Sequence, residues 1–146
     1  MDRHPLNQMT FATKRLPPTP DIVAPDGSDV RVLLATPRGS MAHFELAPGR
    51  ASDAIRHVSV DELWFILAGG GEIWRRQDQR EDIVALEAGI CVSIPAGTHF
   101  QFRATGALAL QAVGVTMPPW PGPQEAVPVK GKWGSEDRGQ KTEDRE

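Results

Sequence analysis

A histidine and a glutamate five residues apart are the side chains of this chain best suited to chemistry. His57 and Glu62 lie in two apolar segments that are separated by a short turn near Val60 and Asp61. On neighbouring strands the two side chains would lie side by side, where a carboxylate raises the pKa of an imidazole and orients its ring. The sequence therefore predicts a catalytic general acid/base pair at the mouth of a pocket. The alternative is a structural pair, in which a buried histidine donates a hydrogen bond to the glutamate.

A tryptophan follows the glutamate on the same face of its predicted strand. Trp64 and Ile66 stand two and four residues after Glu62. Residues at this spacing point the same way in a strand, so both are expected in the interior. Trp64 then belongs either to an apolar core or to a stacking platform for a flat or sugar-like ligand.

Short strands are predicted to position these residues. The chain has 13 prolines and 14 glycines, which mark frequent turns, and few windows show a helical period. A spacing of about 8–12 residues between strands is typical of an all-β barrel or sandwich. The predicted strands cover residues 30–35, 41–46, 54–59, 62–68, 72–76, 83–86, 90–94, 98–104 and 108–116, and a short edge strand is predicted at 9–13.

Composition divides the 146 residues into four parts. Residues 1–28 are predicted to form an irregular N-terminal arm, residues 29–117 the barrel, and residues 118–133 a proline-rich C-terminal strap. Residues 134–146 contain no aliphatic or aromatic side chain and are predicted to be disordered. Because large rings rarely stay loose, Trp120 and Trp133 are expected to pin the strap to the outside of the barrel.

Two apolar runs suggest extensive burial. Residues 63–67 are apolar at every position, which predicts a strand that is covered on both faces. Cys91 lies between Ile90 and Val92 and is predicted to be a small buried hydrophobe.

Two stretches, forty residues apart, resemble the two sequence motifs of the cupin family. The resemblance implies a double-stranded β-helix, the jelly-roll barrel of that family, in which one small ligand fits. The first motif has the form G-x5-H-x-H-x4-E-x6-G and the second G-x5-P-x-G-x2-H-x3-N. Their matching positions in this chain are Gly49, Ile55, His57, Glu62 and Gly69, and then Gly89, Pro95, Gly97, Phe100 and Ala104.

The resemblance also implies an incomplete metal site. In cupins, the histidines and the glutamate of these motifs bind Fe, Mn, Zn or Ni. Here Ile55 and Phe100 stand where two of the histidines would be, so only His57 and Glu62 keep matching positions. Two ligands rarely hold a transition metal. No cofactor is therefore predicted, and a divalent transition metal is the alternative.

The alternation of residues 99–104 leaves two registers open. Without a gap, Phe100 and Phe102 face the pocket together with Ala104. With a shift of one residue, His99 and Gln101 face inward instead, and His57, Glu62 and His99 would form a two-histidine, one-carboxylate metal set. The match without a gap favours the phenylalanines.

Three functions follow from this pattern. The first is a cupin that binds a small organic ligand, such as a sugar-like molecule, without an intact metal site, as a sensor-like protein or as a metal-free isomerase or epimerase. The second is a metal-dependent oxygenase or sugar isomerase that uses His57, Glu62 and His99. The third is a non-catalytic structural or partner-binding module whose barrel is plugged by Trp64, Phe100 and Phe102.

Composition bears on partners and location. The net charge is −3 and both signs are interleaved, which argues against nucleic acid as a partner. No run of 18 apolar residues is present, so no membrane partner is predicted. A single cysteine is typical of a reducing cytoplasm. The apolar outer faces, together with the edge-strand pairing common in cupins, predict a homodimer.

Overall fold

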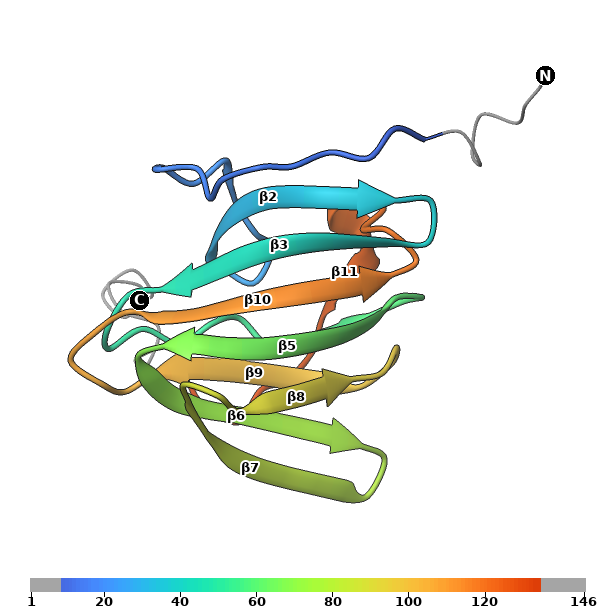
Figure 1. Cartoon of the computed structure of the whole chain (residues 1–146). Coiled ribbons are helices and arrows are strands. Elements are labelled where there is room, and N and C mark those ends of the chain that lie inside the picture. Colours follow the sequence, from blue (N-terminus) through green and yellow to red (C-terminus); the bar gives the residue numbers. More distant parts are fainter. Residues whose placement is uncertain (1–8, 135–146) are drawn as a thin grey trace.

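The computed structural model describes residues 9–134, and they form two antiparallel sheets that face each other (Figure 1). The first sheet has the order β1-β2-β3-β10-β5-β8 and the second the order β11-β4-β9-β6-β7. The strands of the first sheet are β1 (Ile22–Val23), β2 (Asp29–Thr36), β3 (Gly39–Leu46), β10 (Leu110–Met117), β5 (Asp61–Ala68) and β8 (Cys91–Ile94). Those of the second are β11 (Ala126–Pro128), β4 (Ile55–His57), β9 (His99–Ala104), β6 (Gly70–Gln77) and β7 (Arg80–Glu87).

The chain passes back and forth between the two sheets. From β3 onward, the strands alternate between the first and the second sheet, except that β6 and β7 form a hairpin within the second. This winding is the double-stranded β-helix, so the predicted all-β jelly-roll fold is confirmed. Between residues 9 and 134 the only helical element is η2 (Pro123–Glu125), one short turn that is far from the length needed to cross a bilayer.

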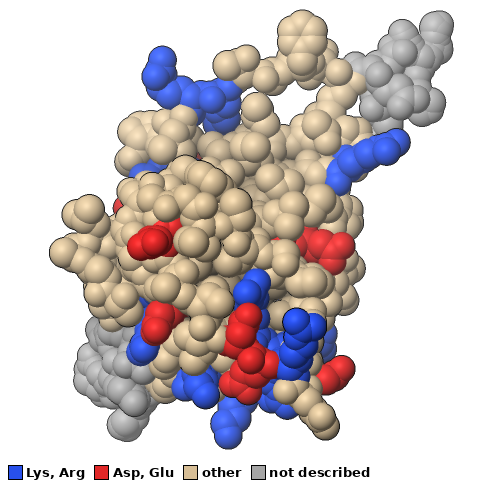
Figure 2. All heavy atoms as spheres, turned by 60° about the horizontal axis from the view of Figure 1, so that its bottom comes forward, with Lys and Arg blue, Asp and Glu red and all other residues tan. Residues whose placement is uncertain are grey.

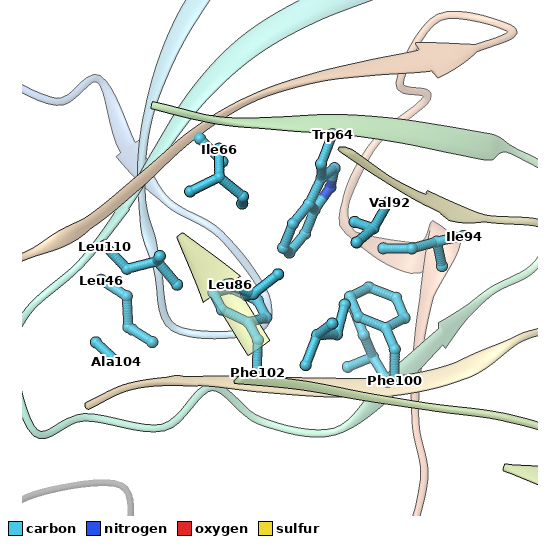
Figure 3. Packing of buried hydrophobic residues seen from close by; sticks show 13 residues of the cluster. Leu46, Trp64, Ile66, Leu86, Val92, Ile94, Phe100, Phe102, Ala104 and Leu110 are labelled. Carbon is cyan, nitrogen blue, oxygen red and sulfur yellow. The ribbon is translucent and has the colours of Figure 1, made fainter. Parts of the chain in front are cut away.

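The core lies between the inner faces of the sheets (Figure 3). Trp64 of β5 points from the first sheet toward Phe100 and Phe102 of β9 in the second, as Figure 3 shows. The ring centroids of Trp64 and Phe102 are 4.9 Å apart with the planes at 87°, and those of Trp64 and Phe100 are 6.2 Å apart. Such edge-to-face contacts place the positive edge of one ring against the negative face of the next.

Strand β9 settles the register that the sequence leaves open. Phe100, Phe102 and Ala104 are buried in the core cluster, which is the arrangement without a gap. His99 and Gln101 therefore lie on the outer face, and the alternative that turns them toward the pocket is wrong. The reason is the strand pairing, which sets Ile55 opposite Phe100.

Gln101 is nevertheless fully buried, because the strap covers it. Its Oε1 accepts hydrogen bonds from the backbone N–H groups of Lys132 and Trp133, and its Nε2 donates to the carbonyls of Ser52 and Trp133. Trp133 also packs over the guanidinium of Arg103, 4.4 Å from the ring centroid. This part of the strap lies on the outside of the barrel, as predicted.

Three local expectations are wrong. Leu63, Phe65 and Leu67 are 50%, 47% and 42% exposed, so β5 is covered on one face only. Cys91 is exposed as well, because it pairs with Phe65 on the same outer face. Residues 9–13 form no strand, and β1 arises instead within the segment predicted to be irregular, where Ile22 pairs with Val30. The predicted tail, from residue 135 on, lies outside the described residues.

Candidate functional site

A pocket of about 400 Å³ opens at one side of the barrel. It lies between the segment that carries β1 and β2, the inner face of β3, β10 and β5, and the start of the strap. Its walls are largely apolar and its polar groups gather in one region. The residues that line it include Ile22, Pro25, Asp26, Val30, Ala42, Phe44, Ile55, His57, Glu62, Trp64, Gly114, Thr116 and Trp120.

His57 and Glu62 meet at this pocket. The Nδ1 atom of His57 lies 3.6 Å from Oε1 of Glu62, and the two side chains are only 4% and 5% exposed. His57 ends β4 and Glu62 is the second residue of β5, so the turn between these strands decides their separation. That turn is held by Glu125 of η2, whose carboxylate accepts hydrogen bonds from the backbone N–H groups of Ser59 and Val60.

The protonation states of the pair follow from burial. Burial raises the pKa of Glu62 from 4.5 to about 8, the indole N–H of Trp64 works against this shift, and the nearby carboxyl group of Asp26 adds to it. Burial also lowers the pKa of His57, with partial compensation from Glu125. Both groups are therefore predominantly neutral near pH 7, with the acid holding its proton. The expectation that the carboxylate raises the pKa of the imidazole is wrong, because burial keeps Glu62 protonated and burial of His57 itself lowers the pKa of the imidazole.

Two aromatic rings hold the imidazole of His57. The ring of Phe100 meets it from within the barrel at a centroid distance of 5.3 Å and 73°. The ring of Trp120 meets it from the strap at 5.3 Å and 71°. The backbone N–H of Trp120 donates to Oγ of Ser40 at 2.9 Å, which ties the strap to β3. Trp120 thus closes part of the pocket mouth, and the expectation that it lies on the outside of the barrel is wrong.

Two buried polar atoms at the pocket have no hydrogen-bond partner among the described residues. They are Nδ1 of His57 and Nε1 of Trp64. The Trp64 indole lies near enough to Glu62 to influence its pKa, yet it makes no hydrogen bond of acceptable geometry with it. An unpaired buried donor or acceptor costs about 1–3 kcal/mol, so such atoms are uncommon without a function.

The structure brings together only part of the predicted site. Ile55, His57, Glu62 and Trp64 line the pocket. Phe100 supports the His57 ring from the core side, and Phe102 packs against Trp64 deeper in the barrel. His99 faces outward between β4 and β6, where it pairs in register with Arg56 and Arg76. Gln101 lies under the strap.

Sequence reasoning missed three pocket residues. Asp26 precedes Gly27 in a pair that is typical of a turn, but it is buried, its carboxyl group accepts two hydrogen bonds from Ser28, and burial raises its pKa. Gly114 lies inside β10, and a glycine within a strand signals a close approach of other groups. A Cβ atom there would lie 2.9 Å from Oε2 of Glu62 and 3.1 Å from Cδ1 of Trp64. Trp120 carried no signal for an inward position.

The donor set does not fit a transition metal. Among residues 9–134, no group of three or more His, Cys, Asp or Glu side chains gathers at one point. Ile55 and Phe100 occupy two of the positions that carry ligands in the motifs, and His99 lies on the opposite face of β9. The set of His57, Glu62 and His99 is therefore wrong as a metal site, and no reaction step is assigned to a metal.

A second hollow of about 410 Å³ lies near the end of the β6–β7 hairpin and is charged. In Figure 2, which brings the bottom of Figure 1 forward, charged side chains gather in the lower part of the view. Arg75 is bound to Asp82 at 3.0 Å and to the carbonyl of Ser93, so its charge is already engaged. The first pocket is therefore the better candidate for a ligand site.

Comparison with known proteins agrees with this fold. A family model described as a cupin domain matches residues 42–116. None of the curated proteins matches the chain. Among solved structures, an uncharacterised conserved protein from Klebsiella pneumoniae with a double-stranded β-helix domain superimposes with a TM-score of 0.58 at 18% identity, over 70% of this chain and 85% of that one.

Two further structures are similar at low identity. The Streptomyces protein PAC13, solved with uridine, gives a TM-score of 0.65 at 15% identity and covers 84% of this chain and 93% of its own. KdgF from a Halomonas species gives a TM-score of 0.63 at 13% identity and covers 75% of this chain and 97% of its own. At such identities the likeness concerns the fold alone.

Proposed function

The chain belongs to the cupin family, and we propose that its barrel binds a small organic molecule without the help of a metal ion. The observation that carries the proposal is the pocket of about 400 Å³ in which His57 and Glu62 lie buried side by side. Ligand sites are typically concave and mostly apolar, with a few convergent polar groups that fix orientation. A buried acid with a displaced pKa in such a pocket is a further mark of a functional site.

The composition of the walls narrows the kind of ligand. Apolar side chains such as Val30, Phe44 and Ile55 line most of the pocket, and its polar side chains gather around His57 and Glu62. A sugar would bury several hydroxyl groups against walls that offer them no partner, which costs free energy. The pocket is better suited to a compact molecule with an apolar body and a polar group at one end.

Filling the pocket tests this proposal. Ala42 lines the pocket, so Ala42→Leu adds bulk inside it, whereas Ala85→Leu makes the same change on an exposed position of β7. We expect ligand-observed NMR with a panel of small neutral fragments to find binders to the wild type and to Ala85→Leu. The same fragments should lose their signals with Ala42→Leu. Binding that survives in Ala42→Leu would contradict the proposal.

A second candidate function is that of a metal-free isomerase or epimerase. The observation that favours it is the pair of protonation states of Glu62 and His57. With the pKa of Glu62 raised to about 8 and that of His57 lowered, the acid can donate a proton and the imidazole can accept one. Incubation of each bound fragment in D2O would reveal this activity as deuterium incorporation at carbon. Incorporation should disappear in Glu62→Gln, and exchange that is unchanged in this variant would contradict an acid/base role.

The other two functions have less support. A metal-dependent enzyme lacks its third ligand, because His99 faces outward. A barrel that is wholly plugged is disfavoured because Trp64, Phe100 and Phe102 fill only one part of the interior and the pocket remains beside them.

A further inference from the structure

We propose that the ligand presents a hydroxyl group to Nε1 of Trp64 and Nδ1 of His57. This inference rests on the proposed function, since it names the polar group by which that same pocket recognises its ligand. Both atoms are buried, both residues line the pocket, and neither atom has a hydrogen-bond partner among the described residues.

The chemistry of the two atoms selects the group. The indole Nε1 can only donate a hydrogen bond. Nδ1 of a neutral imidazole accepts one when the proton is on the other ring nitrogen. A hydroxyl group can accept from the first and donate to the second, so this one group matches the hydrogen-bonding character of both atoms. A carbonyl or ether oxygen would satisfy Trp64 and leave His57 unpaired.

The surroundings disfavour a charged ligand group. Among the described residues that line the pocket there is no Lys or Arg, so a ligand carboxylate would find no cation to pair with. An ion would also lose its hydration among the apolar walls. A neutral alcohol or phenol therefore fits the polar region of the pocket better than an acid.

Three probes with one common body test the inference. 4-Ethylphenol can donate and accept, 4-ethylanisole can only accept, and ethylbenzene can do neither. Affinities for the wild type are measured by NMR titration. A site built for a hydroxyl group rejects analogues that lack it, since its own polar atoms then stay unpaired. We expect 4-ethylphenol to bind at least about tenfold more tightly than either other probe, about 1.4 kcal/mol.

A pair of matched variants assigns the effect to Trp64. Trp64→Phe keeps an aromatic ring and removes the N–H, whereas Trp74→Phe makes the same change at a buried tryptophan whose N–H is bound to Glu81 at 2.8 Å, outside the pocket. The preference for 4-ethylphenol over ethylbenzene should shrink in the first variant and persist in the second. The comparison of probes in the wild type stays decisive even if Trp64→Phe folds poorly.

The outcomes separate this inference from the proposed function. Equal affinity for all three probes would contradict recognition of a hydroxyl group, but the proposed binding of a small molecule would still stand. A preference that persists in a folded Trp64→Phe variant would also overturn it. If no probe and no fragment of the panel binds, the proposed function and this inference fall together.

A different observation leads us to infer that a second copy of this chain covers the outer face of the first sheet. We call six of the outward residues of β5, β8 and β10 the outer patch; they are Leu63, Phe65, Leu67, Cys91, Val113 and Val115. These six are uncharged, and the three from β5 are 42–50% exposed; Asp61, Ser93 and Gln111 lie on the same face beside them. Exposed apolar patches commonly mark contact sites.

The N-terminal arm indicates that the partner is another copy. Met9 and Phe11 are 54% and 96% exposed, so their own barrel does not cover them. Lys14 holds the arm along β2 through a 2.7 Å hydrogen bond to the carbonyl of Val32, and β3 and β10 separate β2 from β5. Under two-fold symmetry, each arm gains an apolar surface on the other protomer, and an uncharged patch meets its own copy without repulsion.

Sedimentation velocity over a dilution series tests the pairing. We expect a wild-type dimer that Phe65→Glu converts to a monomer, while Ile83→Glu, at a 43% exposed position of β7, leaves it intact. Phe11→Ser should weaken the dimer. Cys91 is the only cysteine, so a thiol-specific maleimide should label it slowly in the dimer and rapidly in Phe65→Glu. A wild-type monomer at every concentration, or a dimer untouched by Phe65→Glu, would overturn the inference.

Discussion

The ring of Trp120 stands edge-on to the ring of His57, with 5.3 Å between their centroids. The two residues come from segments far apart in the chain, β4 and the beginning of the strap. The contact makes the strap part of the wall of the pocket, and it leaves the His57 side chain only 4% exposed. Access to the imidazole is therefore expected to depend on this tryptophan.

Removal of the Trp120 ring should expose His57 to reagents. In Trp120→Ala we expect modification of His57 by diethyl pyrocarbonate to increase several-fold, measured by mass spectrometry of the peptides. His43 is 1% exposed on the other face of the first sheet and serves as an internal control, since its modification should not change. Equal modification of His57 in the wild type and the variant would show that Trp120 does not shield it.

The raised pKa of Glu62 predicts how stability depends on pH. The ordinary value is 4.5 and the value in the fold is about 8, so between these limits the folded protein keeps a proton that the unfolded chain releases. Stability therefore falls as the pH rises from about 4.5 to about 8, and it levels off above that range.

Glu62→Gln should remove this decline, because glutamine has no proton to release. Chemical denaturation near pH 5 should give similar stabilities for the two proteins, and near pH 9 the variant should be relatively more stable, by a difference on the order of 3 kcal/mol. Glu87→Gln, at an exposed position of β7, should follow the wild type at both pH values. A parallel pH dependence of Glu62→Gln and wild type would contradict the assigned protonation state.

Glu125 should stabilise the turn that separates His57 from Glu62. Although burial opposes its charge, hydrogen bonds from Ser59 and Val60 hold the pKa of Glu125 below its ordinary value. Hydrogen bonds to charged groups contribute about 1.5–3 kcal/mol, so Glu125→Ala should lower the free energy of unfolding by at least about 2 kcal/mol. Gln124→Ala, at the exposed neighbouring position, should cost far less in the same denaturant titration.

Gly114 should set the room available beside Glu62. A Cβ atom at this position would lie 2.5 Å from a ring carbon of Phe44, as well as close to Glu62 and Trp64. Gly114→Ala should therefore weaken fragment binding and destabilise the fold by about 1–3 kcal/mol. In Gly70→Ala, the new Cβ atom would lie 3.8 Å from its nearest heavy atom, the carbonyl oxygen of Leu86. Fragment affinity should therefore stay at the wild-type level. Unchanged affinity in Gly114→Ala would place the bound fragment elsewhere.

The fold was predictable because several sequence signals agree. The spacing of the strands, the glycines at corners such as Gly69 and Gly89, and the alternation in β9 all indicate the same barrel. Gly69 adopts a φ of 81°, and a Cβ atom there would collide with the backbone of Ala109. A conformation of this kind favours glycine for steric reasons, which is why its spacing carries information.

The site was predictable only in part, because its remaining members depend on long-range packing. Trp120 reaches His57 through the path of the strap, and no local pattern reveals this path. The pKa of the pair depends on how deeply the barrel buries it, so the sequence suggested a charged carboxylate where the fold favours a neutral one. Cys91 and Phe65 are exposed because no other part of the described chain covers the outer face of their sheet. The alternation of residues along a strand does not reveal whether a face is covered.

The most direct test of the pocket is a crystal structure of the protein bound to the strongest fragment of the panel, with anomalous data collected for transition metals. The account predicts density for the fragment between His57, Glu62 and Trp64 and no anomalous peak within bonding distance of either of the first two residues. A metal ion bound to His57 and Glu62, or a fragment seated outside this pocket, would contradict it.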